Sequence, residues 1–260
     1  MRKAIILFLI VIMFVSFNNS CTRSSGEEWI QLFNGKDLDG WIVKFKGYPL
    51  GENLNNTFIV EDGILKVSYE NYGKFNGEYG HIFYKTPYSH YKLRIEYRFV
   101  GEQARGGESW AFRNNGIMFH CQAPETIKAD QDFPVSIEAQ LLGGDSQSER
   151  PTMNVCTPGT DIHMDTALVT QHCVSSISET YNGDVWVTAE LVVYGDSLIV
   201  HKVEGKTVLA YRKPQVGGTN KPRDYPLPDG TPVKEGYIAL QAESHPTEFR
   251  KVELLDLSKK

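Results

Sequence analysis

The chain has 260 residues, with 27 Lys and Arg against 32 Asp and Glu, so its formal net charge is −5. Binding to nucleic-acid phosphates draws on clustered Lys and Arg, and no such cluster occurs here, which excludes a nucleic-acid partner. The 23 Gly exceed the usual share of about 7%, and with 13 Tyr and 13 Phe they indicate many turns between aromatic-rich strands. The length fits one all-β domain, since sandwiches reach roughly 200–250 residues.

The N-terminus has the pattern of an export signal. The basic start Met1–Lys3 precedes 12 apolar residues, Ala4 to Val15. This order is typical of a secretory signal peptide, and the apolar run is too short to span a bilayer, which takes about 20 residues. Cys21 follows Ser20, which is similar to a bacterial lipoprotein signal, in which the Cys thiol is acylated. We therefore expect a lipoprotein signal peptide at 1–20 and a short tether at 21–28; ordinary secretion with a free or paired Cys21 is the alternative.

Cleavage after residue 20 changes both the charge and the location of the protein. It removes Arg2 and Lys3 and no acidic residue, so 25 basic residues face 32 acidic ones and the formal charge falls to −7. A neutral substrate suits this surface better than a polyanion. We expect an exported lipoprotein, in the periplasm or at the outer membrane, that meets the membrane only through its lipid anchor.

Alternation of apolar and polar residues with a period of two predicts strands along most of the chain. His90–Phe99 alternates over its whole length. Asp62-Gly63 lies between two apolar runs and predicts a hairpin over 58–67, because Gly accepts the positive φ of such turns. Further strands are expected at 134–142, 184–194, 197–203, 207–211, 236–241 and 248–255.

No helix is expected, because no segment of about 12 or more residues keeps an apolar stripe of helical spacing between caps. We therefore predict a single domain at 29–257 with an all-β fold, an antiparallel β-sandwich. Two long stretches, 143–178 and 213–233, look irregular. Loops of that length in a compact domain are commonly functional.

Three cysteines follow Cys21. An exported chain meets an oxidising compartment in which disulfides persist, and Cys156 and Cys173 lie 17 positions apart on one irregular stretch. We expect a bridge between them, worth about 3 kcal/mol on the chain-entropy estimate; three reduced thiols are the alternative. Cys121 lies in an apolar run and is expected to be a buried thiol. Zinc is disfavoured, because no Cys-x-x-Cys pair occurs.

Two of the expected strands carry polar side chains that share one face by their parity. These are Glu138 and Gln140 on the first strand and, if the second strand runs on, Gln241, Glu243 and His245. A buried polar group needs a partner or a role. The pattern therefore predicts a polar concave sheet surface, and an ordinary solvated face is the alternative.

The segment before and within 117–121 adds further candidates. Arg113 supplies a planar donor fork and Asn115 an amide, and the parity places His120 on the same face as Gln122. Taken singly, His120 is either a structural histidine or a base.

Other kinds of site find less support. In the string Asp161–Asp165, two carboxylates flank His163, so a divalent metal is possible there, although carboxylates around a loop histidine are common. No Gly-x-Ser-x-Gly elbow and no phosphate loop occurs. A retaining glycosidase needs two carboxylates about 5 Å apart, and the strand around Glu138 offers only one, so ordinary glycosidase chemistry from that strand is disfavoured.

Five short motifs occur in the order in which a known family carries them. They are Leu32–Trp41, Asn115–Ile117, Ile137–Gln140, Gly236–Gln241 and Phe249-Arg250. From about residue 29 to 257 the sequence resembles the 3-keto-disaccharide hydrolase domain family, also described as 3-keto-glucoside lyase/hydratase, and the region 154–173 is similar to a branch of it. The resemblance implies a jelly roll similar to the concanavalin A-like lectins and glucanases, and an exported protein.

The resemblance also implies chemistry on a glycoside already oxidised at C3. The ketone acidifies the C2 proton, so a general base can remove it, an enolate forms, and the aglycone leaves from C1 by elimination. Water then adds to the unsaturated product. Such a site needs a base, donors for the enolate oxygen and an acid for the leaving group.

The resemblance and the strand parity together suggest roles for the candidate residues. Residues on the family's motif positions are Glu138 as base and Asn115, Gln140 and Gln241 as substrate-binding groups. Residues proposed from local parity or the branch resemblance are His120 as alternative base, Arg113 as donor, and Glu243 with His245 as acid and positioning groups.

A second class of function uses the same fold. A carbohydrate-binding lipoprotein without catalysis would bind an unoxidised glycan unchanged, and jelly rolls host many lectins, so fold alone cannot decide. A structural envelope protein is the third class, favoured only if neither binding nor turnover is seen.

Overall fold

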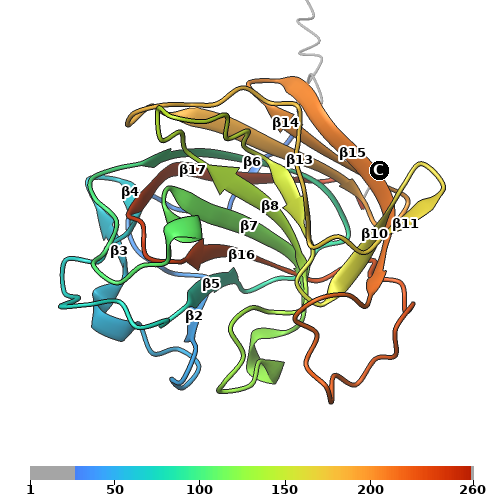
Figure 1. Cartoon of the computed structure of the whole chain (residues 1–260), viewed down its shortest axis with the longest axis horizontal. Helices are drawn as coiled ribbons and strands as arrows, with labels where there is room; N and C mark the ends of the chain where they lie inside the picture. The colour runs from blue at the N-terminus through green and yellow to red at the C-terminus, as the bar shows by residue number, and fades with distance from the viewer. Residues whose placement is uncertain (1–26, 259–260) are drawn as a thin grey trace, which may run out of the picture.

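The computed structural model describes residues 27–258 and consists of two antiparallel sheets packed face to face (Figure 1). This arrangement confirms the predicted all-β antiparallel sandwich. The expected signal peptide, Cys21 and most of the tether lie outside the described residues, so they stay predictions. The described part of the chain contains no helix with the length and apolar character that crossing a bilayer requires.

The larger sheet has ten strands in the order β11-β10-β15-β14-β13-β6-β17-β4-β3, with β1 paired to β17. Their bounds are β1 Ile30–Gln31, β3 Phe58–Glu61, β4 Ile64–Val67, β6 His90–Phe99, β10 Thr160–Met164, β11 Ala167–Val169, β13 Val187–Tyr194, β14 Leu198–Val203, β15 Lys206–Val216 and β17 Thr247–Asp256.

The smaller sheet has seven strands in the order β12-β9-β8-β7-β16-β5-β2 and carries the candidate site. Their bounds are β2 Trp41–Phe45, β5 Gly80–Tyr84, β7 Asn114–Cys121, β8 Ile137–Leu142, β9 Asn154–Cys156, β12 Cys173–Val174 and β16 Tyr237–Ala242. Figure 1 shows β8, β7, β16 and β5 side by side in one layer, with β6 and β13 in the other.

The core lies between the two sheets and follows the period-two pattern. Leu93, Ile95 and Tyr97 of β6 are fully buried, and they face Ile117 and Phe119 of β7 in one continuous apolar cluster. Because alternate residues of a strand point to opposite faces, the residues between these core positions on the smaller sheet point outward. That outward face is where the polar candidates of β8 and β16 emerge.

The predicted hairpin and the later predicted strands fall close to their predicted places. The turn at Asp62-Gly63 joins β3 to β4, and both residues have positive φ, 51° and 77°. Within 27–258, helix is confined to three 3-10 turns: η1 Leu54–Asn56, η2 Ser109–Ala111 and η3 Pro124–Thr126.

The prediction that 143–178 is irregular was wrong. This stretch contains β9, β10, β11 and β12, and β15 runs on to Val216 in the second stretch. The strands β9 to β12 have only two to five residues, and Gly, Thr and Pro interrupt the segments around them. The alternation of apolar and polar residues is therefore too short to be recognised.

The predicted disulfide is present. Cys156 of β9 and Cys173 of β12 are bridged and lie directly opposite each other in the antiparallel register. Cys121 is a free and buried thiol, as expected. The bridge therefore ties the edge strand β12 to the smaller sheet.

Candidate active site

A glycine at the centre of the smaller sheet makes room for the polar side chains of its outward face. Gly116 of β7 pairs with Gln140 of β8; on the other side Leu240 pairs with Ile117, which puts Gln241 beside Gly116. A Cβ at Gly116 would lie 2.4 Å from the Glu138 Oε1 and 2.6 Å from the Gln241 Oε1. Glu138 and Gln241 thus extend into the space that a side chain at position 116 would occupy.

A cavity of about 340 Å³ opens over this face. Its floor is formed by side chains of the sheet, and its walls by the disulfide and by five connecting segments. The lining residues are Trp110, Asn114, Phe133, Glu138, Gln140, Cys156, Pro158, His172, Cys173, Asn220 and Glu243. The structure thus brings Glu138, Gln140 and Glu243 to one cavity from segments far apart in the sequence.

Two buried carboxyl groups lie on the floor. Glu138 is 7% and Glu243 3% exposed. Burial raises the pKa of Glu243 to about 8, and burial together with the nearby Glu243 charge raises the pKa of Glu138 well above its ordinary value. Since two close carboxyls in a dry site do not readily both ionise, the pair holds at least one proton at neutral pH. One group can therefore serve as base while the other stays an acid.

Several polar atoms around the cavity are buried without a hydrogen-bond partner among the described residues. They are both amide atoms of Gln241, the Oε2 of Glu243, the Oδ1 of Asn114 and the Nδ1 of His172. An unsatisfied buried polar atom costs about 1–3 kcal/mol. A polar ligand would satisfy such a group of donors and acceptors, which is the pattern of a binding site.

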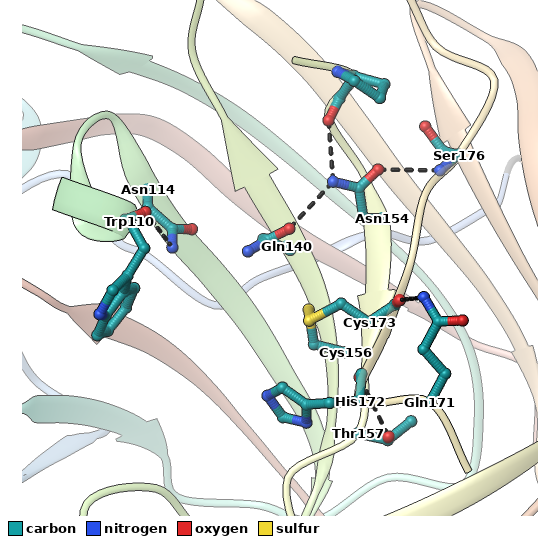
Figure 2. The surroundings of a disulfide bond; sticks show 11 residues. Trp110, Asn114, Gln140, Asn154, Cys156, Thr157, Gln171, His172, Cys173 and Ser176 are labelled. Atoms are coloured by element: carbon teal, nitrogen blue, oxygen red, sulfur yellow. Dashed lines mark hydrogen bonds between the residues drawn. A yellow bond between two sulfur atoms is a disulfide. The ribbon is translucent and has the colours of Figure 1, made fainter. Parts of the chain in front are cut away.

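Gln140 is held in place by its neighbour on β9. The Asn154 Nδ2 donates to the Gln140 Oε1 over 3.0 Å, and the Asn154 Oδ1 accepts from the Ser176 backbone N–H over 2.9 Å. Figure 2 shows the Gln140 amide nitrogen pointing away from Asn154. The hydrogen bond thus fixes which way this amide presents its donor.

Aromatic rings form one side of the cavity entrance. Trp110 of η2 is 49% exposed; its ring stacks on Tyr79 with centroids 5.9 Å apart. Tyr79 in turn packs on Phe133 at 5.3 Å. An exposed aromatic face of this kind offers apolar surface on which the C–H face of a sugar ring packs.

The disulfide forms the opposite side. Cys156 lies opposite Glu138 in the register of β9 with β8, so the bridge lines the cavity beside that carboxyl. The preceding residue, His172, is anchored because its carbonyl accepts the Thr157 backbone N–H over 2.9 Å. In Figure 2 the His172 ring extends from the bridge toward the side on which Trp110 lies.

The two other histidine candidates do not reach the cavity. His120 has a φ of 50° at a register shift of β16 against β7, which breaks the alternation on which the prediction was based. Its Nε2 lies 3.2 Å from the Gly195 carbonyl, and burial lowers its pKa to about 4. His120 is therefore corrected to a structural histidine.

His245 was expected to continue the parity of Gln241 and Glu243. The strand β16 ends at Ala242, and Ser244 has a φ of 97°, so the alternation stops before His245. The His245 ring packs between Phe99 and Phe112, with centroid distances of 5.6 and 5.2 Å. The prediction that it faces the site was wrong.

Arg113 and Asn115 also have structural roles. Arg113 has a φ of 42°, and its guanidinium pairs with the Asp184 carboxylate at 2.9 Å. Asn115 points to the core side, where its amide donates to the Gln241 carbonyl over 2.9 Å. Because neighbours on a strand alternate, Asn114, one position earlier, is the asparagine that lines the cavity.

The possible metal string does not gather into a site. Among residues 27–258, no three His, Cys, Asp or Glu side chains are arranged to hold a metal ion. In the string itself, the Nδ1 of His163 lies 3.3 Å from the Lys213 carbonyl, and Asp165 occupies the turn between β10 and β11 with a φ of 53°.

Six lining residues were missing from the predicted site: Asn114 of β7 and five residues of loops. Trp110, Phe133, Pro158, His172 and Asn220 come from connecting segments outside the sheet strands. Loop residues show no periodicity that would predict where they fold. From the sequence, only Trp110 and His172, which precedes a cysteine, could have been considered as candidates.

The fold and site together define a class: a lectin-like β-sandwich with a buried carboxyl pair in a sugar-sized cavity. Residues 28–255 match the model of the 3-keto-alpha-glucoside-1,2-lyase-like domain family. The match covers most of the chain, so the protein belongs to this family, and the resemblance noted in the sequence is confirmed. Membership places the chain among carbohydrate-active domains. The search of curated proteins returned no match.

Solved structures share the architecture at low sequence identity. A predicted glycosyl hydrolase of Parabacteroides distasonis is 18% identical with a TM-score of 0.54, covering 89% of this chain and 95% of that chain. A second one from the same organism is 17% identical with a TM-score of 0.52, covering 88% and 100%. A Bacillus subtilis protein of unknown function with a galectin-like fold is 9% identical with a TM-score of 0.55, covering 88% and 94%. These similarities establish the fold.

Proposed function

We propose that the protein cleaves 3-keto-glycosides, including 3-keto-disaccharides, by removing the C2 proton, eliminating the aglycone and hydrating the product. Three features support this proposal: the family membership, the cavity of sugar-ring size and the carboxyl pair on its floor. The carboxyl pair is the observation that carries the proposal, because elimination next to a ketone needs one ionised base and one group that stays protonated.

Glu138 is the proposed base. It extends into the space left by Gly116, and burial together with the Glu243 charge raises its pKa, which makes the ionised carboxylate a stronger base. The C2 hydrogen of the bound sugar is acidified by the C3 ketone. Its removal leaves an enolate whose negative charge lies largely on the C3 oxygen.

Glu243 is the proposed donor to that oxygen. A carboxyl with a pKa of about 8 is protonated at neutral pH and can donate a hydrogen bond to an enolate, as a buried carboxylic acid does in other enolising enzymes. Gln241 lies beside Gly116 with both amide atoms unpartnered, so its N–H can add a second hydrogen bond. Such preorganised donors are usually the largest contribution to catalysis.

The test is cleavage of a 3-keto-disaccharide followed by NMR, with release of a monosaccharide as the readout. We expect Glu138→Gln to reduce kcat at least 1000-fold, in the range of a lost base, with Tm unchanged or higher, because a buried carboxyl is replaced by a neutral amide of equal size. Glu52→Gln, the same change at an exposed residue outside the cavity, is the control. Turnover by the Glu138→Gln variant would refute the assignment of the base.

The same experiment separates catalysis from binding alone. A non-catalytic carbohydrate-binding lipoprotein would bind an unoxidised glycan and release no product from the 3-keto form. We further propose that the protein is an exported lipoprotein: the N-terminal pattern and a disulfide in the cavity wall, which persists in oxidising compartments, both support this location.

A further inference from the structure

The stereochemistry of an α-glucoside separates the base from the leaving group. In the chair form of the sugar, the C2 hydrogen is axial on one face of the ring and the α-linked oxygen at C1 is axial on the other. The group that removes the C2 proton and the group that protonates the departing oxygen must therefore approach from opposite faces. The matched family is described by its action on α-glucosides, so this geometry applies to the proposed reaction.

The two carboxyls of the floor lie on the same side of any sugar bound against the sheet. Glu138 and Gln241 both extend over Gly116 from the outward face of the smaller sheet, and Glu243 lines the same cavity two positions beyond Gln241. None of them can reach the opposite face of the ring while another removes the C2 proton. A proton for the leaving group has to come from a residue of the cavity wall.

Only one wall residue can supply a proton. Of the residues that line the cavity, the titratable ones are Glu138, Glu243 and His172, since both cysteines are joined in the disulfide. The remaining wall residues are aromatic, proline or amide side chains. The chemistry of the lining thus singles out His172.

The position of His172 fits that role. It directly precedes β12, the edge strand of the smaller sheet, and the order β12-β9-β8-β7-β16 puts it on the side of Glu138 away from Glu243. The bridge at Cys173 and the hydrogen bond from Thr157 to the His172 carbonyl hold its backbone. The Nδ1 of its ring is buried and has no partner among the described residues, so the ring lacks a hydrogen bond that a ligand can provide.

We propose, on the basis of the function proposed above, that His172 protonates the leaving oxygen of the α-glycoside. In this step the enolate electron pair forms the C1–C2 double bond and the C3 carbonyl is restored. The C1–O bond breaks, and the departing oxygen takes a proton from the imidazolium form of His172, which becomes neutral imidazole. Burial lowers the pKa of this ring, so its protonated form is a stronger acid than an exposed imidazolium. The proton that Glu138 removed from C2 then returns to the imidazole through solvent, so the site is reset without any other reactant.

The inference is tested with two substrates that differ only in the leaving group. A p-nitrophenyl 3-keto-α-glucoside expels a stable phenolate that needs no proton, whereas the methyl 3-keto-α-glucoside must expel methoxide unless a proton is supplied. We expect His172→Gln to lower kcat/KM for the methyl glycoside about 100-fold or more, the usual contribution of a general acid, and for the p-nitrophenyl glycoside less than about threefold. His172→Asn provides a second variant, and His163→Gln, outside the cavity, is the control.

The ratio between the two substrates does not depend on how much of a variant is folded. Equal losses on both substrates would show that His172 only supports the structure, and a retained rate on the methyl glycoside would show that another group supplies the proton; either result overturns the inference. If the wild-type protein cleaves neither substrate, the proposed function itself fails.

Discussion

The glycine at the centre of the smaller sheet allows a direct test of the site. In Gly116→Ala, the new Cβ would lie 2.4 Å from the Glu138 Oε1 and 2.6 Å from the Gln241 Oε1, whereas ordinary van der Waals contact begins at 3.4 Å. Both side-chain ends must therefore retreat by about 1 Å. A displacement of about 1 Å in a catalytic group costs roughly 100-fold in rate, or about 2.7 kcal/mol in the activation barrier.

The fold should tolerate this change. Gly116 has no positive φ, and the atoms nearest to the new methyl group belong to side chains rather than to the backbone. Overpacking costs about 1–3 kcal/mol, and the loss of glycine in a strand returns roughly 0.5–1 kcal/mol. We therefore expect a Tm within a few degrees of the wild type and a kcat on a 3-keto-glycoside lower by roughly 100-fold.

The assay compares kcat, KM and Tm with those of Gly73→Ala. At Gly73 a Cβ would meet no atom within 4 Å and the φ is not positive, so this variant controls for the substitution itself. A Gly116→Ala variant with wild-type kcat would refute the reasoning, because it would show that the Glu138 and Gln241 side chains do not need their present positions.

Two further predictions concern stability. Burial raises the pKa of Glu243 from 4.5 to about 8. Between pH 4.5 and pH 8, the folded protein therefore keeps a proton that the unfolded chain releases. The contribution of this proton to the free energy of unfolding is fully present below pH 4.5 and is lost as the pH rises toward 8. The Tm of the wild type should therefore fall relative to that of Glu243→Gln from pH 5 to pH 8 in thermal melts, and parallel curves would contradict this origin. Replacing Cys156 and Cys173 together by Ser should lower the free energy of unfolding by about 3 kcal/mol, measured by urea denaturation of the oxidised wild type and the variant; a loss below about 1 kcal/mol would mean that other contacts hold β12.

Strands could be predicted from the sequence where they are long and half-buried. Residues 90–99 alternate over ten positions and form β6 with those bounds. The short strands β9 to β12 lie in 154–174, where each run has five residues or fewer. A period cannot be recognised over so few residues, so these strands depend on tertiary pairing for their formation.

The candidate site was predictable only as far as the alternation stayed regular. Glu138 and Gln140 lie within an uninterrupted strand, and their parity gave the correct face. His120 and His245 each lie at or next to a residue with positive φ, at His120 and Ser244, and a residue in that conformation redirects the following side chains. Histidine is enriched at positive φ, but only a few per cent of non-glycine residues adopt this conformation, so the residue types alone did not reveal the change.

In each sheet, an interior strand is the last one in the chain and lies between two strands that precede it. β16 inserts between β5 and β7, and β17 between β6 and β4. Until residues 237–256 have joined the fold, each sheet therefore lacks an interior strand and keeps unpaired inner edges, and Glu243 is not yet attached to the sheet that carries Glu138. Folding is consequently a late event that couples both layers, and a chain interrupted before residue 237 would expose open sheet edges, which favour aggregation.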